Sequence, residues 1–271
     1  MLKQINGQTE IYGLVGFPIS HSLSPKIHNY LFNLFELNAV YLCFNSKFEI
    51  EDFKNFLNSL KKVENFKGLN VTIPYKEWGC NFSQNEFKSL GAINCIKFYK
   101  DKIIATNTDI YGFKMALKND LNFNWNNKNI LIFGAGATAK TIIYSIIDEV
   151  NKIYIYNRTL KNAEKLKNFF NKEKIIIGFP ENFEIIDLVI NSTPIGLHGE
   201  ELNIDYKKLK KDCCLFDVIY LDTPFIKKGK ELGLKAINGK SMLIYQAVKS
   251  FEYWTGLDVN ETVIKSIFKE L

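Results

Sequence analysis

The sequence has little of what stabilises small secreted or metal-dependent proteins. It contains only five cysteines in 271 residues, an odd number, and none of them forms a C-x-x-C pair. The three histidines, His21, His28 and His198, are spaced unlike any metal site that we recognise, so we predict none. The adjacent Cys213 and Cys214 lie in an apolar run, where free thiols fit a reducing compartment rather than a disulfide framework.

Long hydrophobic runs are also lacking. No stretch of about 18 apolar residues could span a bilayer, and the first residues show no hydrophobic core of a secretory signal. We therefore expect a cytoplasmic protein with no membrane partner. The 46% hydrophobic and 24% charged residues are typical of an ordinary globular chain, and 271 residues suggest one or two domains.

The excess of positive charge is small. The formal net charge is +6, the lysines are scattered, and no aromatic residues interleave with a basic stripe. This pattern predicts no nucleic-acid partner. A modest positive field would help to attract an anionic small-molecule substrate and a phosphorylated cofactor.

Short apolar runs alternate with longer amphipathic stretches, which is typical of an α/β protein with mostly parallel sheets. Strands are expected first at Ile11–Val15, Val40–Phe44, Gly68–Thr72, Ala92–Phe98 and Ile103–Thr106, with helices at Pro25–Leu37, Glu51–Lys61 and briefly after Pro74. After a polar stretch at Asn122–Asn129 the pattern restarts, with strands at Ile130–Phe133, Ile153–Tyr156, Ile175–Ile177, Leu188–Asn191, Leu215–Val218 and Leu234–Ile237. Further helices are expected at Asp109–Leu117, Ala137–Glu149, Leu160–Phe170, Ser241–Thr255 and Glu261–Leu271. Two sheets are implied.

A G-x-G-x-x-A sequence between an expected strand and an expected helix predicts a dinucleotide site. Its residues are Gly134, Ala135, Gly136, Ala137, Thr138 and Ala139. Gly134 allows a tight turn, Gly136 lets the backbone approach a pyrophosphate, and Ala139 permits close packing of helix on strand. The helix N-terminus offers free N–H groups to the phosphates. The alternative is a glycine turn with no nucleotide.

The segment after the next strand indicates which dinucleotide is bound. NAD sites usually carry an acidic residue there for the ribose 2′-hydroxyl, whereas this chain has Asn157, Arg158 and Thr159. An asparagine does not repel a 2′-phosphate, and the Arg158 guanidinium can bind one with two hydrogen bonds. The sequence therefore favours NADP over NAD. Thr159 adds a hydroxyl or caps the next helix.

A third polar loop, Asn191–Gly196, follows a buried strand of the same series. Hydroxyls, a proline and a glycine at the carboxyl end of a strand are typical of a loop over the ligand crevice of an α/β sheet. We expect this loop to line the ribose or nicotinamide side of the cofactor. An ordinary turn is the alternative.

Polar residues also follow the strands of the first series. Ser22 and Ser24 alternate as in an extended segment, which predicts that both hydroxyls face one pocket, unless Ser24 only caps the helix that begins at Pro25. On the next such strand, Asn70 and Thr72 would point to one face.

Lys76 follows the second of these segments, and Asp109 ends an N-T-D run after a later strand, with Asn94 on the neighbouring arm. Oxidation of an alcohol needs a group that takes the hydroxyl proton while hydride leaves carbon. If Lys76 and Asp109 face each other, they can serve as proton donor and acceptor.

Eight motifs occur in one order over nearly the whole chain: H-S-x-S-P, N-V-T-x-P-x-K, G-A-x-N, N-T-D-x-x-G, G-A-G-x-x-A, N-R-T, N-S-T-P-x-G and M-L-x-x-Q-A. Together they resemble the shikimate dehydrogenase family, and the joint match is highly specific although no single motif is. The resemblance implies a substrate domain of residues 1–108 completed by 239–271, and an inserted Rossmann-type NADP domain of residues 109–238, with the active site in the cleft between them. It implies reversible reduction of 3-dehydroshikimate to shikimate with NADPH, in aromatic amino-acid biosynthesis. We expect a monomer or a homodimer.

The same resemblance assigns roles residue by residue. It makes Lys76 and Asp109 the catalytic pair. The substrate ligands that it implies are Ser22, Ser24, Thr72, Asn94, Tyr220 and Gln246. The cofactor residues that it implies are Gly134–Ala139, Asn157, Arg158, Thr159, Thr193 and Gly239.

The chain departs from the family pattern in two places. Ser241 stands where the family often has a glycine before Met242, which weakens the expected contact with the nicotinamide. Asn162, beside Lys161, stands where the family often has a second arginine, so a 2′-phosphate is expected to be held less tightly.

Two alternatives stay open. One is a quinate/shikimate dehydrogenase that uses NAD or NADP, since the sequence does not exclude activity on both acids. The other is a non-catalytic NADP-binding sensor, although a pure binder has no need of Lys76 and Asp109.

Overall fold

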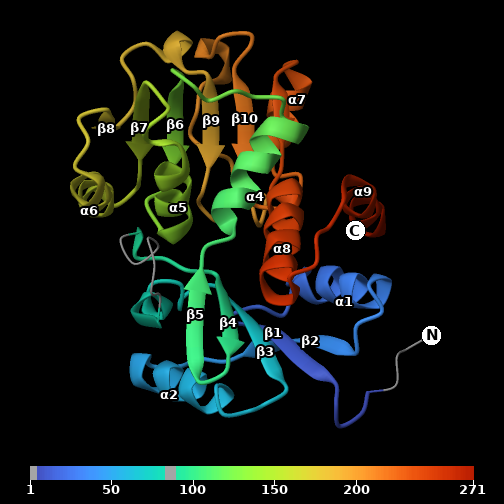
Figure 1. Cartoon of the computed structure of the whole chain (residues 1–271). Coiled ribbons are helices and arrows are strands. Elements are labelled where there is room, and N and C mark those ends of the chain that lie inside the picture. Colours follow the sequence, from blue (N-terminus) through green and yellow to red (C-terminus); the bar gives the residue numbers. More distant parts are fainter. Residues whose placement is uncertain (1–4, 83–89) are drawn as a thin grey trace. The chain divides into compact units, whose positions relative to one another are not determined.

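The structure is a computed structural model that describes residues 5–82 and 90–271. The chain divides into two compact units (Figure 1): the first unit comprises Met1–Gly112 with Ile244–Leu271, and the second unit comprises Phe113–Leu243. That residues 1–108 and 239–271 bind the substrate, and that residues 109–238 bind NADP, stays a prediction.

The first unit contains a five-stranded mixed sheet with the order β2-β1-β3-β4-β5. Strand β1 pairs in parallel with β2 and β3, whereas β4 pairs antiparallel with both β3 and β5. The strands are β1 Glu10–Gly16, β2 Ala39–Asn45, β3 Phe66–Val71, β4 Cys95–Tyr99 and β5 Lys102–Thr106. Among the described residues, the helices that contribute to this unit include α1 Ser24–Leu34, α2 Ile50–Leu60, a 3-10 segment Trp78–Phe82, α4 Asp109–Met115, α8 Lys240–Thr255 and α9 Glu261–Glu270.

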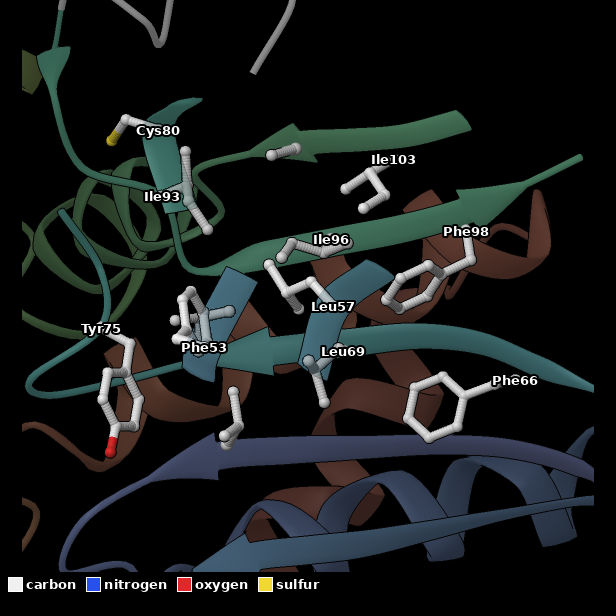
Figure 2. Packing of buried hydrophobic residues seen from close by; sticks show 13 residues of the cluster. Phe53, Leu57, Phe66, Leu69, Tyr75, Cys80, Ile93, Ile96, Phe98 and Ile103 are labelled. Carbon is white, nitrogen blue, oxygen red and sulfur yellow. The ribbon is translucent and has the colours of Figure 1, made fainter. Parts of the chain in front are cut away.

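The two faces of this sheet bury different sets of side chains, because successive residues of a strand point to opposite faces. Val15 of β1 belongs to a buried apolar cluster that includes Phe53 of α2, and Figure 2 shows this cluster. On the other face, the ring centroid of Tyr12 lies 4.8 Å from that of Phe32 in α1 and 5.2 Å from that of Trp254 in α8. Helix α8, which comes late in the chain, therefore completes the core of the first unit.

The second unit contains a six-stranded parallel sheet with the order β11-β10-β9-β6-β7-β8. Its strands are β6 Asn129–Phe133, β7 Lys152–Tyr156, β8 Ile175–Ile177, β9 Leu188–Asn191, β10 Cys214–Asp217 and β11 Lys235–Ile237. Its helices include α5 Ala137–Ile146, α6 Leu160–Phe170, α7 Pro224–Glu231, a π-helical segment Ala116–Asp120 and 3-10 turns at Phe183–Ile185 and Tyr206–Lys208. From β6 the chain continues through β7 to β8 at one edge of the sheet, and from β9 it continues through β10 to β11 at the other edge. This is the doubly wound order whose ligand crevice lies where the order reverses, at the carboxyl ends of β6 and β9.

The predicted α/β class is confirmed. Helix α7, Pro224–Glu231, was not predicted, and other differences lie at the ends of elements. The helix expected at Pro25–Leu37 ends at Leu34, since Glu36 adopts a left-handed backbone with φ 54°. The strand expected at Ala92–Phe98 begins only at Cys95.

One local expectation is wrong. Ser22 and Ser24 do not alternate along an extended segment, because Leu23 between them has a right-handed helical backbone. Ser24 is the first residue of α1 rather than its cap, and its N–H donates to Ser22 Oγ at 3.2 Å. The beginning of α1 thus sets the positions of the Ser22 and Ser24 hydroxyls.

The described parts of the chain, 5–82 and 90–271, hold no helix that is both long and apolar enough to cross a membrane. The same ranges hold no group of three or more His, Cys, Asp or Glu side chains arranged to bind a metal ion. Cys213 and Cys214 are buried, and burial raises the pKa of the Cys213 thiol to about 12. Both cysteines therefore act as packing residues.

Candidate active site

Lys76 and Asp109 meet in the first unit, although 33 positions separate them in the sequence. Lys76 lies in the turn after β3, just past Pro74, and Asp109 begins α4 directly after β5. Lys76 Nζ donates to Asp109 Oδ2 at 2.6 Å, and the two side chains are only 12% and 9% exposed. A lysine and a carboxylate are therefore held in contact and largely shielded from water, while each keeps some exposure to a ligand.

Asn94 ties this pair to two further segments. Its Nδ2 donates to Asp109 Oδ1 at 2.8 Å and to Gln246 Oε1 of α8 at 3.3 Å. Its Oδ1 accepts the Thr108 N–H at 2.7 Å, which fixes the orientation of the amide. Both oxygens of Asp109 are thus paired, one with Asn94 and one with Lys76. The structure brings together four predicted site residues: Lys76, Asn94, Asp109 and Gln246.

The other predicted substrate ligands of the first unit follow β1 and β3 in the chain. Thr72 follows β3 and is packed beside Gly16, the last residue of β1, where an added Cβ would lie 2.3 Å from Thr72 Cγ2. The segment after β1 is anchored to this point because Phe17 N–H donates to the Ile73 carbonyl at 2.9 Å. Ser22 is half-buried and Ser24 is buried.

Buried polar residues outside the predicted ligand set form a hydrogen-bond network next to the pair. The Asn70 amide donates to Ser250 Oγ at 3.0 Å and accepts from the buried Tyr41 hydroxyl at 2.7 Å. Ser250 Oγ lies 2.9 Å from Thr108 Oγ1. One sequence signal could have indicated Ser250: it is four residues after Gln246, so both lie on one face of α8.

In the second unit, the glycine sequence forms the tight connection between β6 and α5 that was predicted from it. Gly134 has φ 110°, and an added Cβ would lie 2.6 Å from Ser192 Oγ, so a side chain is excluded on two grounds. Gly136 precedes the first turn of α5, which receives no side-chain cap, and a Cβ there would meet no atom within 4 Å. Open space in front of uncapped N–H groups is the environment that a pyrophosphate needs, so these residues fit a dinucleotide.

The loop after β9 is held by a buried carboxylate. Asp217 accepts from Thr223 Oγ1 at 2.6 Å and from Asn191 Nδ2 at 3.1 Å, and Asn191 Oδ1 accepts the Thr193 hydroxyl at 2.7 Å. Burial raises the pKa of Asp217, although these hydrogen bonds oppose the effect. Hydrogen bonds to Asn191 of β9, which is itself bonded to Asp217 of β10, therefore fix the predicted cofactor residue Thr193.

The remaining predicted residues of the second unit differ in exposure. Arg158 is exposed and Asn157 is half-buried, its amide donating to the Thr159 carbonyl at 2.9 Å. Thr159 occupies the cap position of α6, but its side chain makes no cap hydrogen bond. Tyr220 is half-buried after β10, and burial raises the pKa of its phenol.

Gly239 lies against the backbone of the chain that follows β10. An added Cβ would be 2.2 Å from the Val218 carbonyl oxygen, and its N–H donates to Ile219 O at 2.8 Å. Close packing against the backbone therefore excludes a side chain at position 239.

Comparisons with known proteins agree along the chain. Residues 14–96 match the model of the shikimate dehydrogenase substrate binding domain, residues 116–213 that of shikimate / quinate 5-dehydrogenase, and residues 239–266 that of the shikimate 5'-dehydrogenase C-terminal domain. The NADP(+) shikimate dehydrogenase of Aquifex aeolicus is 37% identical over 274 residues, covering 98% of this chain and 99% of that protein.

Solved structures of similar proteins have the same fold. The crystal structure of shikimate dehydrogenase from Aquifex aeolicus has a TM-score of 0.89 at 34% identity, covering 98% of this chain and 100% of that one. A shikimate dehydrogenase in complex with NADP+ has a TM-score of 0.87 at 33% identity, covering 99% and 98%. Quinate dehydrogenase from Corynebacterium glutamicum in complex with NAD has a TM-score of 0.85 at 26% identity, covering 97% and 99%. Matching family models over most of its length, together with a relative 37% identical over nearly all of it, show that the chain belongs to the shikimate dehydrogenase family.

Proposed function

We propose that the protein is an NADP-dependent shikimate dehydrogenase, which reduces 3-dehydroshikimate to shikimate reversibly in the biosynthesis of aromatic amino acids. The observation that carries this proposal is the contact of Lys76 Nζ with Asp109 Oδ2 at 2.6 Å, in a largely buried site lined by Asn94 and Gln246. Family membership supplies the substrate class, and NADP-bound relatives support the cofactor.

Each predicted substrate residue has its own role. The Ser22 and Ser24 hydroxyls bind the substrate carboxylate, with Thr72 beside them, and Tyr220 is a further substrate ligand. Asn94, Asp109 and Gln246 bind ring hydroxyls. Lys76 exchanges a proton with the reacting oxygen, while Asp109 orients the Lys76 ammonium and the substrate.

The cofactor, when bound, would supply the hydride chemistry: NADP+ is the acceptor for shikimate oxidation and NADPH the donor for reduction of the ketone. The residues proposed to hold it are Gly134–Ala139, Asn157, Arg158, Thr159, Thr193 and Gly239. The uncapped start of α5 suits the pyrophosphate, and the exposed Arg158 suits the 2′-phosphate because a guanidinium binds phosphate with paired hydrogen bonds.

The direct test is absorbance at about 340 nm with purified protein, offering shikimate or quinate with NADP+ or NAD+ in all four pairings. We expect reduction to be fastest with shikimate and NADP+. Faster turnover with quinate or NAD+ would place the chain among quinate/shikimate dehydrogenases, an alternative favoured by the similarity to a quinate dehydrogenase that binds NAD. No reduction in any pairing, with NADPH still bound, would favour a non-catalytic sensor.

Replacing Arg158 by Ala is expected to raise the KM for NADP+ about tenfold or more, since a hydrogen-bonded charge pair contributes about 1.5–3 kcal/mol. The KM for NAD+, which lacks the 2′-phosphate, should change little. Initial rates with each cofactor at saturating shikimate measure both values.

The matched control is Lys211→Ala. Lys211 is exposed and precedes β10, at the amino ends of the strands, so its loss removes a positive charge far from the carboxyl ends where the cofactor is proposed to bind. Equal effects of the two substitutions, or equal effects of Arg158→Ala on both cofactors, would contradict the role given to Arg158.

A further inference from the structure

We propose that Ser250 is a positioning residue for the Lys76–Asp109 pair, acting through Thr108 and Asn94. The inference rests on the proposed function, because it assigns Ser250 a part in the turnover that the pair performs. All of the residues involved belong to the first unit.

Ser250 is held by hydrogen bonds on two sides. Tyr41 OH donates to Asn70 Oδ1 at 2.7 Å, so the Asn70 amide is fixed with its Nδ2 toward Ser250. An amide nitrogen only donates, and Ser250 Oγ therefore accepts at 3.0 Å. On the other side, the Ser250 and Thr108 hydroxyls share a hydrogen bond with their oxygens 2.9 Å apart, and either hydroxyl can be its donor.

Thr108 connects Ser250 to the Asn94 amide. The Thr108 Oγ1 atom lies 3.2 Å from Asn94 Oδ1 and 3.0 Å from Asn94 Nδ2, and Asn94 Oδ1 also accepts the backbone N–H of Thr108 at 2.7 Å. Asn94 Nδ2 then faces Asp109 Oδ1 at 2.8 Å. A reversed Asn94 amide would place its oxygen against the carboxylate and its NH₂ against the Thr108 N–H, and both contacts are repulsive.

This row of hydrogen bonds ends at Asp109, whose other oxygen accepts from Lys76. Connected hydrogen bonds polarise and strengthen each other where water is excluded. The exposed fractions are 0% for Ser250, 3% for Thr108 and 3% for Asn94, so bulk water does not replace a lost partner. Removal of the Ser250 hydroxyl therefore frees the Thr108 hydroxyl to reorient and loosens the amide that holds Asp109 in place.

The experiment compares Ser250→Ala with Ser250→Thr, which restores the hydroxyl. We expect kcat for shikimate oxidation to fall about tenfold in Ser250→Ala, the effect of one buried hydrogen bond lost with its partners left unpaired. The KM values for shikimate and NADP+ should stay within about twofold, since the Ser250 side chain is fully buried. Ser250→Thr should recover most of kcat.

Ser145→Ala is the matched control for loss of a buried helical serine. Ser145 is 6% exposed in α5, and its hydroxyl donates back to the Ile142 carbonyl of the same helix at 2.7 Å. Thermal unfolding of both variants separates stability from turnover. A kcat of Ser250→Ala within about twofold of the unsubstituted chain would overturn the inference, as would an equal loss in Ser145→Ala.

A double-mutant cycle tests the path through Thr108. In Thr108→Val the hydroxyl that Ser250 orients is absent, so adding Ser250→Ala should change kcat by less than about twofold, whereas independent effects multiply. Multiplying effects would overturn the path. The unsubstituted chain is assayed first: no turnover there would overturn the proposed function and this inference together, whereas turnover with an unchanged kcat in Ser250→Ala would overturn this inference alone.

Discussion

Lys76→Met is expected to lower kcat for shikimate oxidation by about 10²–10⁴, the usual contribution of a positioned proton donor and acceptor. Methionine has nearly the length of the lysine stem and carries no proton to exchange. Asp109→Ala should cause a loss in the same range, because the Lys76 ammonium is then no longer held at its 2.6 Å contact. Initial rates at saturating shikimate and NADP+ measure both effects.

The losses in kcat should not multiply when Lys76→Met and Asp109→Ala are combined, because the two side chains act together. Lys102→Met, at an exposed lysine of β5 in the same unit, controls for the loss of one positive charge. Thermal unfolding of each variant shows whether the fold persists, since removing one partner leaves the other buried charge unpaired. Near-normal turnover in both Lys76→Met and Asp109→Ala would rule out the catalytic assignment.

His28 is expected to make the first unit sensitive to acid. Its side chain is fully buried in α1, stacked on Tyr41 with ring centroids 4.3 Å apart, and neither ring nitrogen meets the geometry of a hydrogen bond. Burial lowers the pKa of His28 from 6.5 to about 3, and Asn70 opposes this shift. The folded chain therefore keeps His28 neutral at a pH where the unfolded chain binds a proton.

The sign of the effect follows from linkage. A folded-state pKa below the unfolded value contributes stability that is complete above about pH 6.5 and is lost as the pH falls toward about 3. At about 1.4 kcal/mol per pH unit, the total loss from His28 is roughly 4–5 kcal/mol. By pH 4.5 the loss should be about 2.5–3 kcal/mol.

His28→Phe keeps an aromatic ring beside Tyr41 and removes the titrating group. We expect the free energy of unfolding of this variant to fall less between pH 7 and pH 4.5 than that of the unsubstituted chain, by about 2.5–3 kcal/mol. Urea unfolding can be followed by tryptophan fluorescence, because the Trp254 ring lies 5.1 Å from His28. His198→Phe, at an exposed histidine of the second unit, is the control for the loss of an imidazole that is not buried. Parallel pH profiles for His28→Phe and the unsubstituted chain would contradict the prediction.

The local patterns in the sequence were sufficient for much of the fold. The alternation of apolar runs predicted strands in both units, and the glycine sequence predicted the turn at Gly134, where φ is 110°. Such features depend on residues within a few positions of each other, so the sequence alone determines them. The segment around Ser22 shows the limit, since an alternating pattern was taken for extended chain although Leu23 is helical.

The candidate site depends on contacts between distant positions. The motifs indicated Lys76, Asn94, Asp109 and Gln246 separately, and only the folding of β3, β4, α4 and α8 together sets their hydrogen bonds. Ser250 carries no motif at all, and its importance depends on its position between two other buried polar groups.

The sequence by itself thus determined the α/β class, the dinucleotide turn and the residue types available for chemistry, because these follow from local backbone preferences and short spacings. The tertiary structure decided which polar groups pair. The physical reason is burial: most polar groups removed from water are paired within about 3 Å, and only the packed sheet and helices determine which partner is there.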